Sequence, residues 1–462
     1  MNARPVRAWS CRRALQPASV VLAAIALASC GGSGHAGTAV TRTAAAADTH
    51  GVSGDPVVVA SSASTSAAIA PARTASTAPT PGRVNPLHPT QLVNLPKPAA
   101  GGLTLVLDRP SGLFSQQNEL IMRGVLAALS ALNSQGGVAH TKVRLVTADL
   151  DGLSAAAVQE RLRASGPNPV LILPCDSNSQ ATLATGAARY GTLMLAPCSA
   201  DASLAQRLPT YWAIGMDGSD ESQGLVSYVT RVGFSPVFIV NVSGSSFAAS
   251  MSAYFQAFMK RAGRSVDGST TIPSTPSAAD IARAVSAVKA ARPAAYALYT
   301  PLAPPYVDEL AAALERAGER LDLFGTSAMD VPLTLSSRDS GALQGTTVPT
   351  YGFLPDGAQG SAFLRAYREQ FGSAPVGAFP DLGFETIGLL EDAIAKARST
   401  RPAALQQALV GGIADSGVAL FGRTYDRAND HNPVTTVSLE QINQGGLLPV
   451  LTIEPDGSPP PP

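Results

Sequence analysis

The stretch VLILPCDSNSQATLA, residues 170–184, decides the fold. Its first four residues are a continuous apolar run, which is typical of a strand covered on both faces of a parallel sheet. Pro174 ends this strand, and small polar residues then precede a helix that we expect to begin near Gln180. Ligands of open parallel sheets bind beyond the carboxyl ends of strands, so residues 175–179 suit ligand contact as well as helix capping.

The next predicted strand repeats this arrangement. Residues 193–201, LMLAPCSAD, again place a proline and small residues after an apolar run. Two neighbouring strand ends with the same chemistry favour ligand contact over capping alone. Cys175 and Cys198 each follow a strand-terminal proline, and adjacent strands would bring their Cβ atoms near disulfide distance. We predict a Cys175–Cys198 disulfide, with two buried free thiols as the alternative.

The same alternation of strand and helix patterns extends along residues 101–453. The predicted strands are 103–107, 143–147, 170–173, 193–196, 237–242, 295–299, 435–439 and 448–453. The predicted helices are 120–133, 155–163, 248–261, 278–291, 307–317, 361–371, 384–397 and 402–410. This order indicates an α/β protein of doubly wound parallel sheets, and the number of strands requires more than one sheet.

The N-terminal segment has the pattern of a bacterial lipoprotein signal. Arginines precede the apolar run 20–27, which is too short to span a bilayer, and the sequence Leu-Ala-Ser-Cys at 27–30 looks like a lipobox. We therefore predict a signal peptide at 1–29 and lipidation of Cys30; the alternative is a free cysteine after an ordinary signal. Gly31 after the cysteine is typical of transfer to the outer membrane in Gram-negative cells.

Residues 30–98 are rich in Ala, Thr, Ser and Pro, and they contain no aromatic residue. Such a composition cannot bury enough apolar surface to offset the entropy of ordering, so we predict a disordered tether. The folded part would then lie outside the cytoplasm, in the periplasm or at the cell surface, held to a membrane by a lipid. The proline-rich residues 456–462 are predicted to be a frayed tail.

Composition argues against several functions. Lys and Arg total 33, as do Asp and Glu, so there is no basic field to attract nucleic acid. Three of the five histidines lie in the tether, and we expect the other two, His140 and His431, on surface loops. We find no histidine cluster for a metal, no catalytic triad, and no phosphate-binding or dinucleotide-binding glycine motif. We therefore predict no enzyme activity, no metal and no cofactor.

Several motifs in order resemble the type I periplasmic binding proteins, in particular the leucine/isoleucine/valine-binding family. GVLAALSALNSQGG at 124–137, KVRLV at 142–146 and Asp149 look like the family's first βαβ unit. The later matches are the serine-rich loop at 175–179, the strand and ligand loop at 193–199, Ser-Gln-Gly at 222–224, the helix 384–397 and FGRTYD at 421–426. The resemblance covers residues 103–453 and implies two α/β lobes joined by three crossovers, which close on a ligand. It places lobe one at 99–231 and 355–420, and lobe two at 232–354 and 421–455.

The resemblance also implies a set of ligand-binding residues: Phe114, Asp176, Ser177, Ser179, Cys198, Ser199, Ala200, Phe247, Ser327 and Asp330. Three positions depart from the family pattern. Asp176 would repel a ligand carboxylate, and Ala200 lacks the hydroxyl of the family's usual threonine. The acidic residue that pairs with a ligand ammonium should follow Phe324-Gly325, and only the displaced Asp330 is available there.

Two functions follow from this pattern. The first is a lipid-anchored solute-binding protein that carries a small amino-acid-like or other small organic ligand to the permease of an ABC importer. The alternative is an outer-membrane lipoprotein that uses the same fold to regulate a cell-wall synthase or another envelope partner. The first predicts an open polar cleft, and the second predicts a filled or collapsed one.

Overall fold

The computed structural model describes residues 92–95, 102–109, 114–198, 201–291, 297–302, 305–331, 334, 340–351, 358–415, 423–425, 431, 436–443 and 446–453. All of them belong to one compact unit of the chain, residues 69–462. The predicted signal peptide, Cys30, most of the predicted tether and the predicted tail lie outside the described residues.

The first sheet has five strands, all parallel. Its order is β2 (Arg144–Ala148), β1 (Thr104–Asp108), β3 (Pro169–Ile172), β4 (Met194–Ala196) and β5 (Tyr211–Ala213). Every residue of the second strand in this order, β1, is buried, because helices cover both faces of the sheet. This explains why its sequence, TLVLD, does not alternate between apolar and polar residues.

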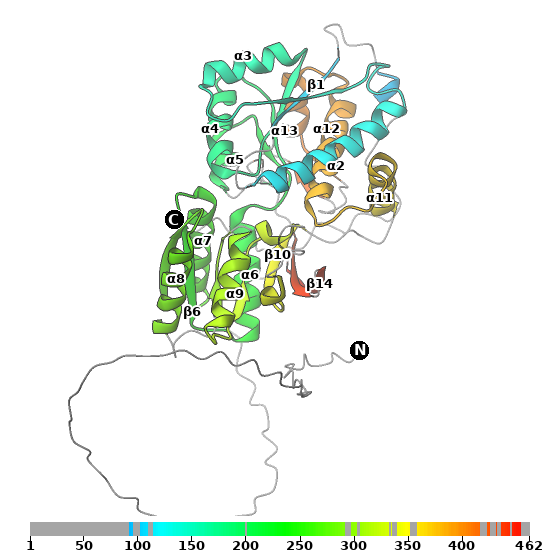
Figure 1. The fold of residues 1–462 in the computed structure, drawn as a ribbon. Helices are drawn as coiled ribbons and strands as arrows, with labels where there is room; N and C mark the ends of the chain where they lie inside the picture. Colours follow the sequence, from blue (N-terminus) through cyan, green and yellow to red (C-terminus); the bar gives the residue numbers. More distant parts are fainter. Residues whose placement is uncertain are drawn as a thin grey trace, which may run out of the picture. The chain divides into compact units, whose positions relative to one another are not determined.

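Among the described residues, seven helices accompany this sheet: α2 (Ser115–Ser134), α3 (Ala155–Ser165), α4 (Ser177–Ala188), α5 (Ser203–Arg207), α11 (Ala358–Phe371), α12 (Phe379–Ala397) and α13 (Pro402–Val410). Figure 1 shows α2 crossing α12, and the contact between these two helices is the most extensive between any two elements of the described chain. Gly124 and Gly383 allow it, because a Cβ atom at either position would overlap backbone of the facing helix.

The second sheet has seven strands. Its order is β14 (Gly446–Ile453), β13 (Val437–Asn443), β10 (Thr347–Thr350), β9 (Asp322–Phe324), β8 (Ala297–Tyr299), β6 (Val237–Ser243) and β7 (Val266–Pro273). The strands β6 to β10 are parallel to one another, whereas β13 pairs antiparallel with both β10 and β14. The accompanying elements are α6 (Gly218–Val232), α7 (Ser246–Arg261), α8 (Ala278–Ala291), α9 (Tyr306–Arg316) and the 3-10 turns η1 (Ser327–Met329) and η2 (Ser340–Leu343). A separate short ladder pairs β11 (Ile413–Asp415) with β12 (Arg423–Tyr425).

The chain order divides these elements into two lobes. The first lobe is the five-stranded sheet with α2 to α5 and α11 to α13, and the second lobe is the seven-stranded sheet with α6 to α9 and the two 3-10 turns. The chain builds β1 to β5, passes to the second sheet for β6 to β10, returns for α11 to α13, and ends in β13 and β14. The predicted α/β fold of doubly wound parallel sheets is confirmed, with the antiparallel pair at one edge as an addition.

Several details differ from the sequence-based expectation, among them the segment Leu92–Leu95 and the strand β7. Leu92–Leu95 falls in the range assigned to the tether, yet Leu92 is fully buried and its carbonyl accepts a hydrogen bond from the Ala139 N–H at 2.8 Å. The folded part therefore includes residues that the prediction assigned to the tether. The strand β7 was not predicted because most of its residues are only partly buried or exposed, as expected of an edge strand. Among the described helices, none is long and apolar enough to cross a membrane.

Candidate ligand-binding site

The first predicted ligand loop lies at the start of α4, and its three implied ligand residues do different things. Asp176 is the N-cap, and its carboxylate accepts the Asn178 N–H at 2.9 Å, so the helix begins at Ser177 rather than near Gln180. The Ser179 hydroxyl donates to Asp151 at 2.8 Å. Ser177 is only 5% exposed, and its hydroxyl has no hydrogen-bond partner. Of the three, Ser177 has a buried polar atom available for a ligand.

The two predicted ligand loops of the first lobe are joined covalently. The strands β3 and β4 are adjacent, and a disulfide links Cys175 to Cys198 with Cα atoms 5.4 Å apart. The Cys175 N–H donates to the Asn118 side chain at 2.7 Å. Ser199 and Ala200, which follow Cys198, lie outside the described residues.

Gln180 also braces these loops, although the sequence did not identify it. Its fully buried side-chain amide donates to the carbonyl oxygens of Pro174 at 2.9 Å and Cys198 at 2.8 Å. The Tyr211 hydroxyl in turn donates to the Gln180 Oε1 atom at 3.2 Å. A glutamine in the first turn of a helix is usually exposed, so only the fold reveals this role.

An aromatic pair connects the two lobes. Phe114, just before α2 in the first lobe, and Phe247, in the first turn of α7 in the second lobe, are both buried, with ring centroids 5.4 Å apart and planes inclined at 68°. This edge-to-face arrangement is favourable for aromatic rings. Nearby, Asn178 accepts the Ser246 N–H at 3.2 Å and donates to the Gly244 carbonyl at 3.3 Å. The beginnings of α4 and α7 are therefore in direct contact.

Ser327 is paired with a carboxylate that sequence reasoning missed. Glu221, in the first turn of α6, accepts both the Ser327 N–H at 2.8 Å and the Ser327 hydroxyl at 2.9 Å. Burial raises the pKa of Glu221 to about 7, and the neighbouring Asp217 adds to the rise, while the two bonds from Ser327 oppose it. The predicted acidic residue after Phe324-Gly325 is thus absent in sequence, but a carboxylate from another helix lies beside that position.

Tyr351 completes this buried group. It follows β10 and lies against Ser327, and burial raises the pKa of its hydroxyl, with the charge of Glu221 as a further cause. Gly215 makes room for the ring, because a Cβ atom there would lie 2.7 Å from the Tyr351 Cε1 atom. Gly215 and Tyr351 lie where the chain leaves and re-enters the first lobe, so the two connections pack against each other.

Asp330 is buried at the junction of the lobes. Its Oδ2 atom accepts the N–H of Ala378, the N-cap residue of α12, at 2.8 Å, and its Oδ1 atom has no hydrogen-bond partner. Burial raises the pKa of Asp330 to about 6, although the bond from Ala378 opposes the rise. The pKa values of Asp381 and Glu440 are also raised, first by burial and then by the charge of Asp330, and that of Glu440 reaches about 7. Burial thus raises the pKa values of carboxyl groups in both lobes, Asp381 in the first and Asp330 and Glu440 in the second.

Other buried polar atoms near the strand ends also have no hydrogen-bond partner. They are Gln117 Oε1 in the first turn of α2, Tyr299 OH at the end of β8 and Thr326 Oγ1 just after β9, and each side chain is at least nine-tenths buried. Unsatisfied buried polar atoms are costly, and they are uncommon in folded proteins unless they serve a purpose. Together with Ser177 Oγ and Asp330 Oδ1, they supply hydrogen-bonding capacity from both lobes.

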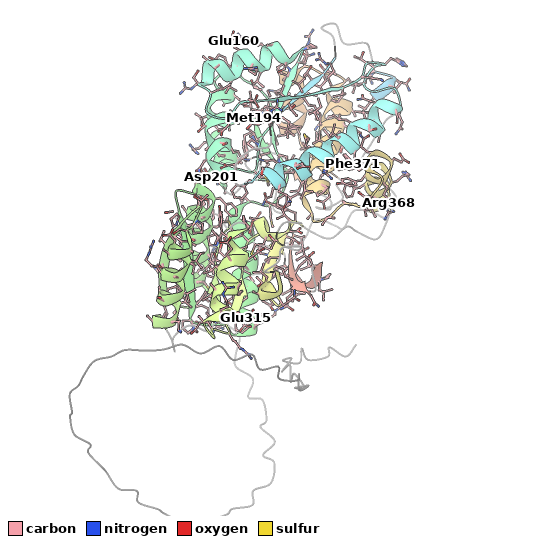
Figure 2. All side chains as sticks on the ribbon, in the orientation of Figure 1. Glu160, Met194, Asp201, Glu315, Arg368 and Phe371 are labelled. Carbon is pink, nitrogen blue, oxygen red and sulfur yellow. A yellow bond between two sulfur atoms is a disulfide. The ribbon has the colours of Figure 1, made fainter. Side chains whose placement is uncertain are left out.

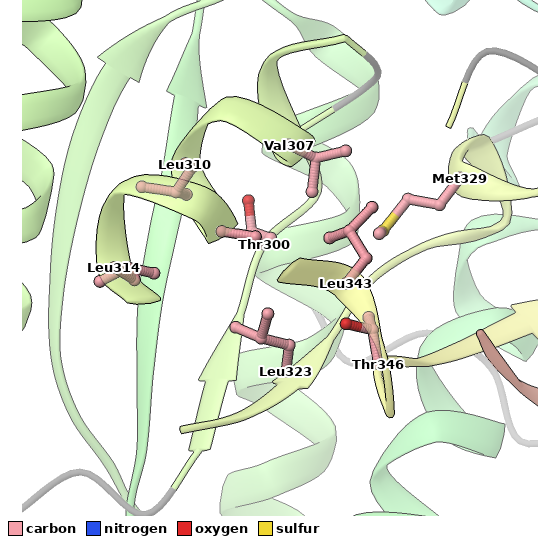
Figure 3. Close-up of a pocket in the computed structure, with 9 residues that line it drawn as sticks. Thr300, Val307, Leu310, Leu314, Leu323, Met329, Leu343 and Thr346 are labelled. Carbon is pink, nitrogen blue, oxygen red and sulfur yellow. The ribbon is translucent and has the colours of Figure 1, made fainter. Parts of the chain in front are cut away.

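A small cavity in the second lobe is not a ligand site. It has a volume of about 10 Å³ and is lined mainly by apolar side chains, among them Val307, Leu310 and Leu314 of α9 and Met329 of η1 (Figure 3). This space is barely enough for one water molecule. The described residues also contain no group of three or more His, Cys, Asp or Glu side chains arranged to hold a metal ion.

His431 departs from the expected surface position. It is 7% exposed, and its ring stacks on Trp212 with centroids 3.8 Å apart, while Nδ1 lies 3.1 Å from the Tyr211 carbonyl. The prediction of a surface loop was wrong for this residue, because the ring covers the edge strand β5. His140 is exposed, as predicted.

Comparisons with known proteins agree with this architecture. The family model described as periplasmic binding protein matches residues 105–446. The leucine-binding protein LivK of Thermotoga maritima is 16% identical, with a TM-score of 0.67 over 77% of this chain and 99% of its own. A solute-binding protein of an R. palustris ABC transporter, in complex with benzoate, is 15% identical, with a TM-score of 0.64 over 77% and 97%.

A third similar structure is a fatty acid ABC transporter substrate-binding protein from Thermomonospora curvata. It is 13% identical, with a TM-score of 0.63 over 79% of this chain and 96% of its own. At these identities the structures show a shared fold. A comparison with curated protein sequences returns no match.

Proposed function

Because the chain belongs to the periplasmic binding protein family, we propose that its two lobes bind a small organic solute between them and deliver it to an ABC permease. The observation that carries this proposal is the set of buried polar atoms without partners in both lobes, together with the Phe114–Phe247 pair that joins the lobes. A ligand between the lobes would satisfy such atoms while its apolar part contacts the two rings.

The side chains suggest a ligand with one compact apolar part and at least one polar end. Phe114 and Phe247 provide apolar surface, and the hydroxyls of Ser177, Tyr299 and Thr326 can each donate or accept a hydrogen bond. Asp330 Oδ1 is a buried carboxylate oxygen without a hydrogen-bond partner. A ligand with a carboxylate fits the hydroxyls, and an ammonium group requires Asp330.

We also propose that Cys30 is lipidated and that the residues after it tether the folded part to a bacterial membrane. The support is the lipobox pattern at 27–30 and the polar, small-residue composition that follows it. Delivery to a membrane-embedded permease requires proximity, and a tether of about 60 residues spans roughly 40 to 45 Å as a flexible coil.

A thermal shift measurement tests solute binding. The full-length protein in mild detergent would be heated with leucine, isoleucine, benzoate, 4-hydroxybenzoate and medium-chain fatty acids, one at a time. A ligand at one hundred times its Kd stabilises the fold by about 2.7 kcal/mol, which raises the melting temperature by several degrees. Unchanged melting with every compound, for a protein that unfolds cooperatively, would contradict the proposal.

One observation favours the second candidate function, an envelope lipoprotein that acts on a protein partner. The lobes already touch through Phe114 and Phe247 and through Asn178, as a filled cleft would require. The thermal shift series separates the two candidates, because a protein that binds only a protein partner does not respond to small solutes.

A further inference from the structure

The turn formed by η1 and Asp330, residues 327–330, contacts both lobes through consecutive residues. It follows β9 of the second sheet, and Glu221 of α6 holds its first residue, Ser327, within the second lobe. Its second residue, Ala328, accepts a hydrogen bond at its carbonyl from the Gln117 side chain of α2 at 3.0 Å. Its last residue, Asp330, accepts the Ala378 N–H at the start of α12. The second lobe thus holds two helices of the first lobe through one turn.

The two points of attachment in the first lobe move as one body. The helices α2 and α12 approach so closely at Gly124 and Gly383 that each glycine faces backbone of the other helix. Gln117 and Ala378 therefore keep a fixed spacing when the lobes move. A turn that matches this spacing can hold both points only in one relative placement of the lobes.

Local sequence is adapted to these contacts. Gly377 has a φ of +71°, and a Cβ atom there would lie 2.8 Å from the Asp330 carbonyl oxygen. Only glycine allows the chain to approach Asp330 and present the Ala378 N–H. Gly325 likewise leaves room for the Met329 side chain within the turn.

The hydrogen bonds from Gln117 and Ala378 to the turn are buried. Gln117 and Asp330 are each 1% exposed, and Ala328 is 2% exposed. Opening the lobes would break the bonds from Gln117 and Ala378, whereas the bonds between Glu221 and Ser327 would persist within the second lobe. The turn therefore has one permanent attachment and two that depend on closure.

We infer that the turn 327–330 is a latch that holds the two lobes closed, with Gln117 and Asp330 as its positioning residues. The inference rests on the proposed function in one respect, since closure serves to retain a solute. The latch itself acts between the lobes of the ligand-free chain, so it can be tested whether or not a solute is found.

The test measures the separation of the lobes by dipolar electron resonance. Spin labels at Glu160→Cys on α3 and Glu315→Cys on α9 report one distance across the junction; both positions are exposed and appear in Figure 2. The full-length chain would carry Cys11→Ser and Cys30→Ser, so that only the introduced cysteines react. The variant Gln117→Met keeps the size of the side chain and removes its donor.

Gln117→Met is expected to lower the ratio of closed to open molecules by about tenfold, the effect of one buried hydrogen bond. Asp330→Leu should lower the ratio of closed to open molecules at least as much. Asp330→Asn retains an acceptor for the Ala378 N–H, so its ratio should be close to that of the unmodified protein. Gln135→Met is the matched control, because Gln135 is exposed at the end of the same helix and its side-chain amide donates to the Ala131 carbonyl of that helix rather than to the second lobe.

Unchanged distances in Gln117→Met and Asp330→Leu, with both variants folded, would overturn the latch. If Asp330→Leu does not fold, Gln117→Met alone decides. Failure of the proposed function has a different signature, since it appears as missing ligand binding in the thermal shift series while the label distances still respond to the latch variants.

Discussion

The predicted ligand loops of the first lobe and the turn 327–330 of the second lobe are held in place in different ways. In the first lobe, the Cys175–Cys198 disulfide and the Gln180 amide fix two neighbouring strand ends to each other. In the second lobe, Asp330 and the Ala328 carbonyl are engaged by helices of the opposite lobe. The first region is held mainly by bonds within its own lobe, whereas the turn is bonded both to its own lobe through Glu221 and to the opposite lobe.

The difference separates bonds that stabilise one lobe from bonds that control the relative motion of the two lobes. Bonds within one lobe survive opening, so the first-lobe loops can meet a solute in their final geometry. Bonds across the junction are present only when the lobes are together, so the second-lobe turn sets the balance between open and closed forms. Changes in the first region should alter global stability, and changes in the second should also alter closure.

The largest expected effect is a dependence of the free energy of unfolding on pH, caused by buried carboxyl groups near the junction of the lobes. Burial raises the folded-state pKa values of four carboxyl groups: Glu221, Asp330, Asp381 and Glu440. Neighbouring charges add to the rise, from Asp217 on Glu221, from Asp330 and Glu440 on Asp381, and from Asp330 on Glu440. Their contribution to stability is fully present at pH values well below about 4, where the carboxyls are protonated in both states. For Glu221, Asp330 and Glu440 it is lost as pH rises through 6 to 7. For Asp330 alone the loss is on the order of 3 kcal/mol.

Urea unfolding at pH 5 and pH 8 measures this effect. The free energy of unfolding should be lower at pH 8, and Asp330→Asn should reduce the difference because it removes one titrating group while keeping an acceptor for Ala378. Glu315→Gln serves as a control on an exposed helix position. A stability that increases from pH 5 to pH 8 would contradict the assignment of these groups as buried carboxyls.

Removal of the disulfide in the first lobe is expected to have a somewhat smaller effect on the free energy of unfolding. Replacing both Cys175 and Cys198 by alanine removes a crosslink between residues 23 apart in sequence, which should lower the free energy of unfolding by about 3 kcal/mol. The measurement is urea unfolding at constant pH. The label distance across the junction should stay unchanged in this variant. A shift of that distance toward open forms would remove the distinction between the two regions.

The fold could be predicted from sequence because burial on both faces leaves a direct mark on the chain. The runs at 170–173 and 237–240 are apolar without alternation, and β3 and β6 lie there. The edge strand β7, Val266–Pro273, carries no such mark, because alternate residues face solvent and its sequence is mostly polar.

The site was less accessible to prediction because its hydrogen bonds join residues far apart in the chain. Glu221 meets Ser327 across 106 residues and Gln117 meets Ala328 across 211, and neither local pattern reveals its partner. Asp176 illustrates another limit, since a short polar residue after a strand can equally contact a ligand or cap a helix, and here it caps α4. Residues 199 and 200 lie outside the described residues, so their predicted ligand contacts stay predictions.

The most direct test of the central claim is calorimetric titration of the compound that gives the largest thermal shift into three proteins: the unmodified chain, Ser177→Ala and Ser179→Ala. Ser177 has a buried hydroxyl without a partner, whereas the Ser179 hydroxyl is bonded to Asp151. A solute held between the lobes predicts about tenfold weaker binding for Ser177→Ala and an unchanged Kd for Ser179→Ala. Equal affinity in all three proteins would contradict a binding site at this strand end.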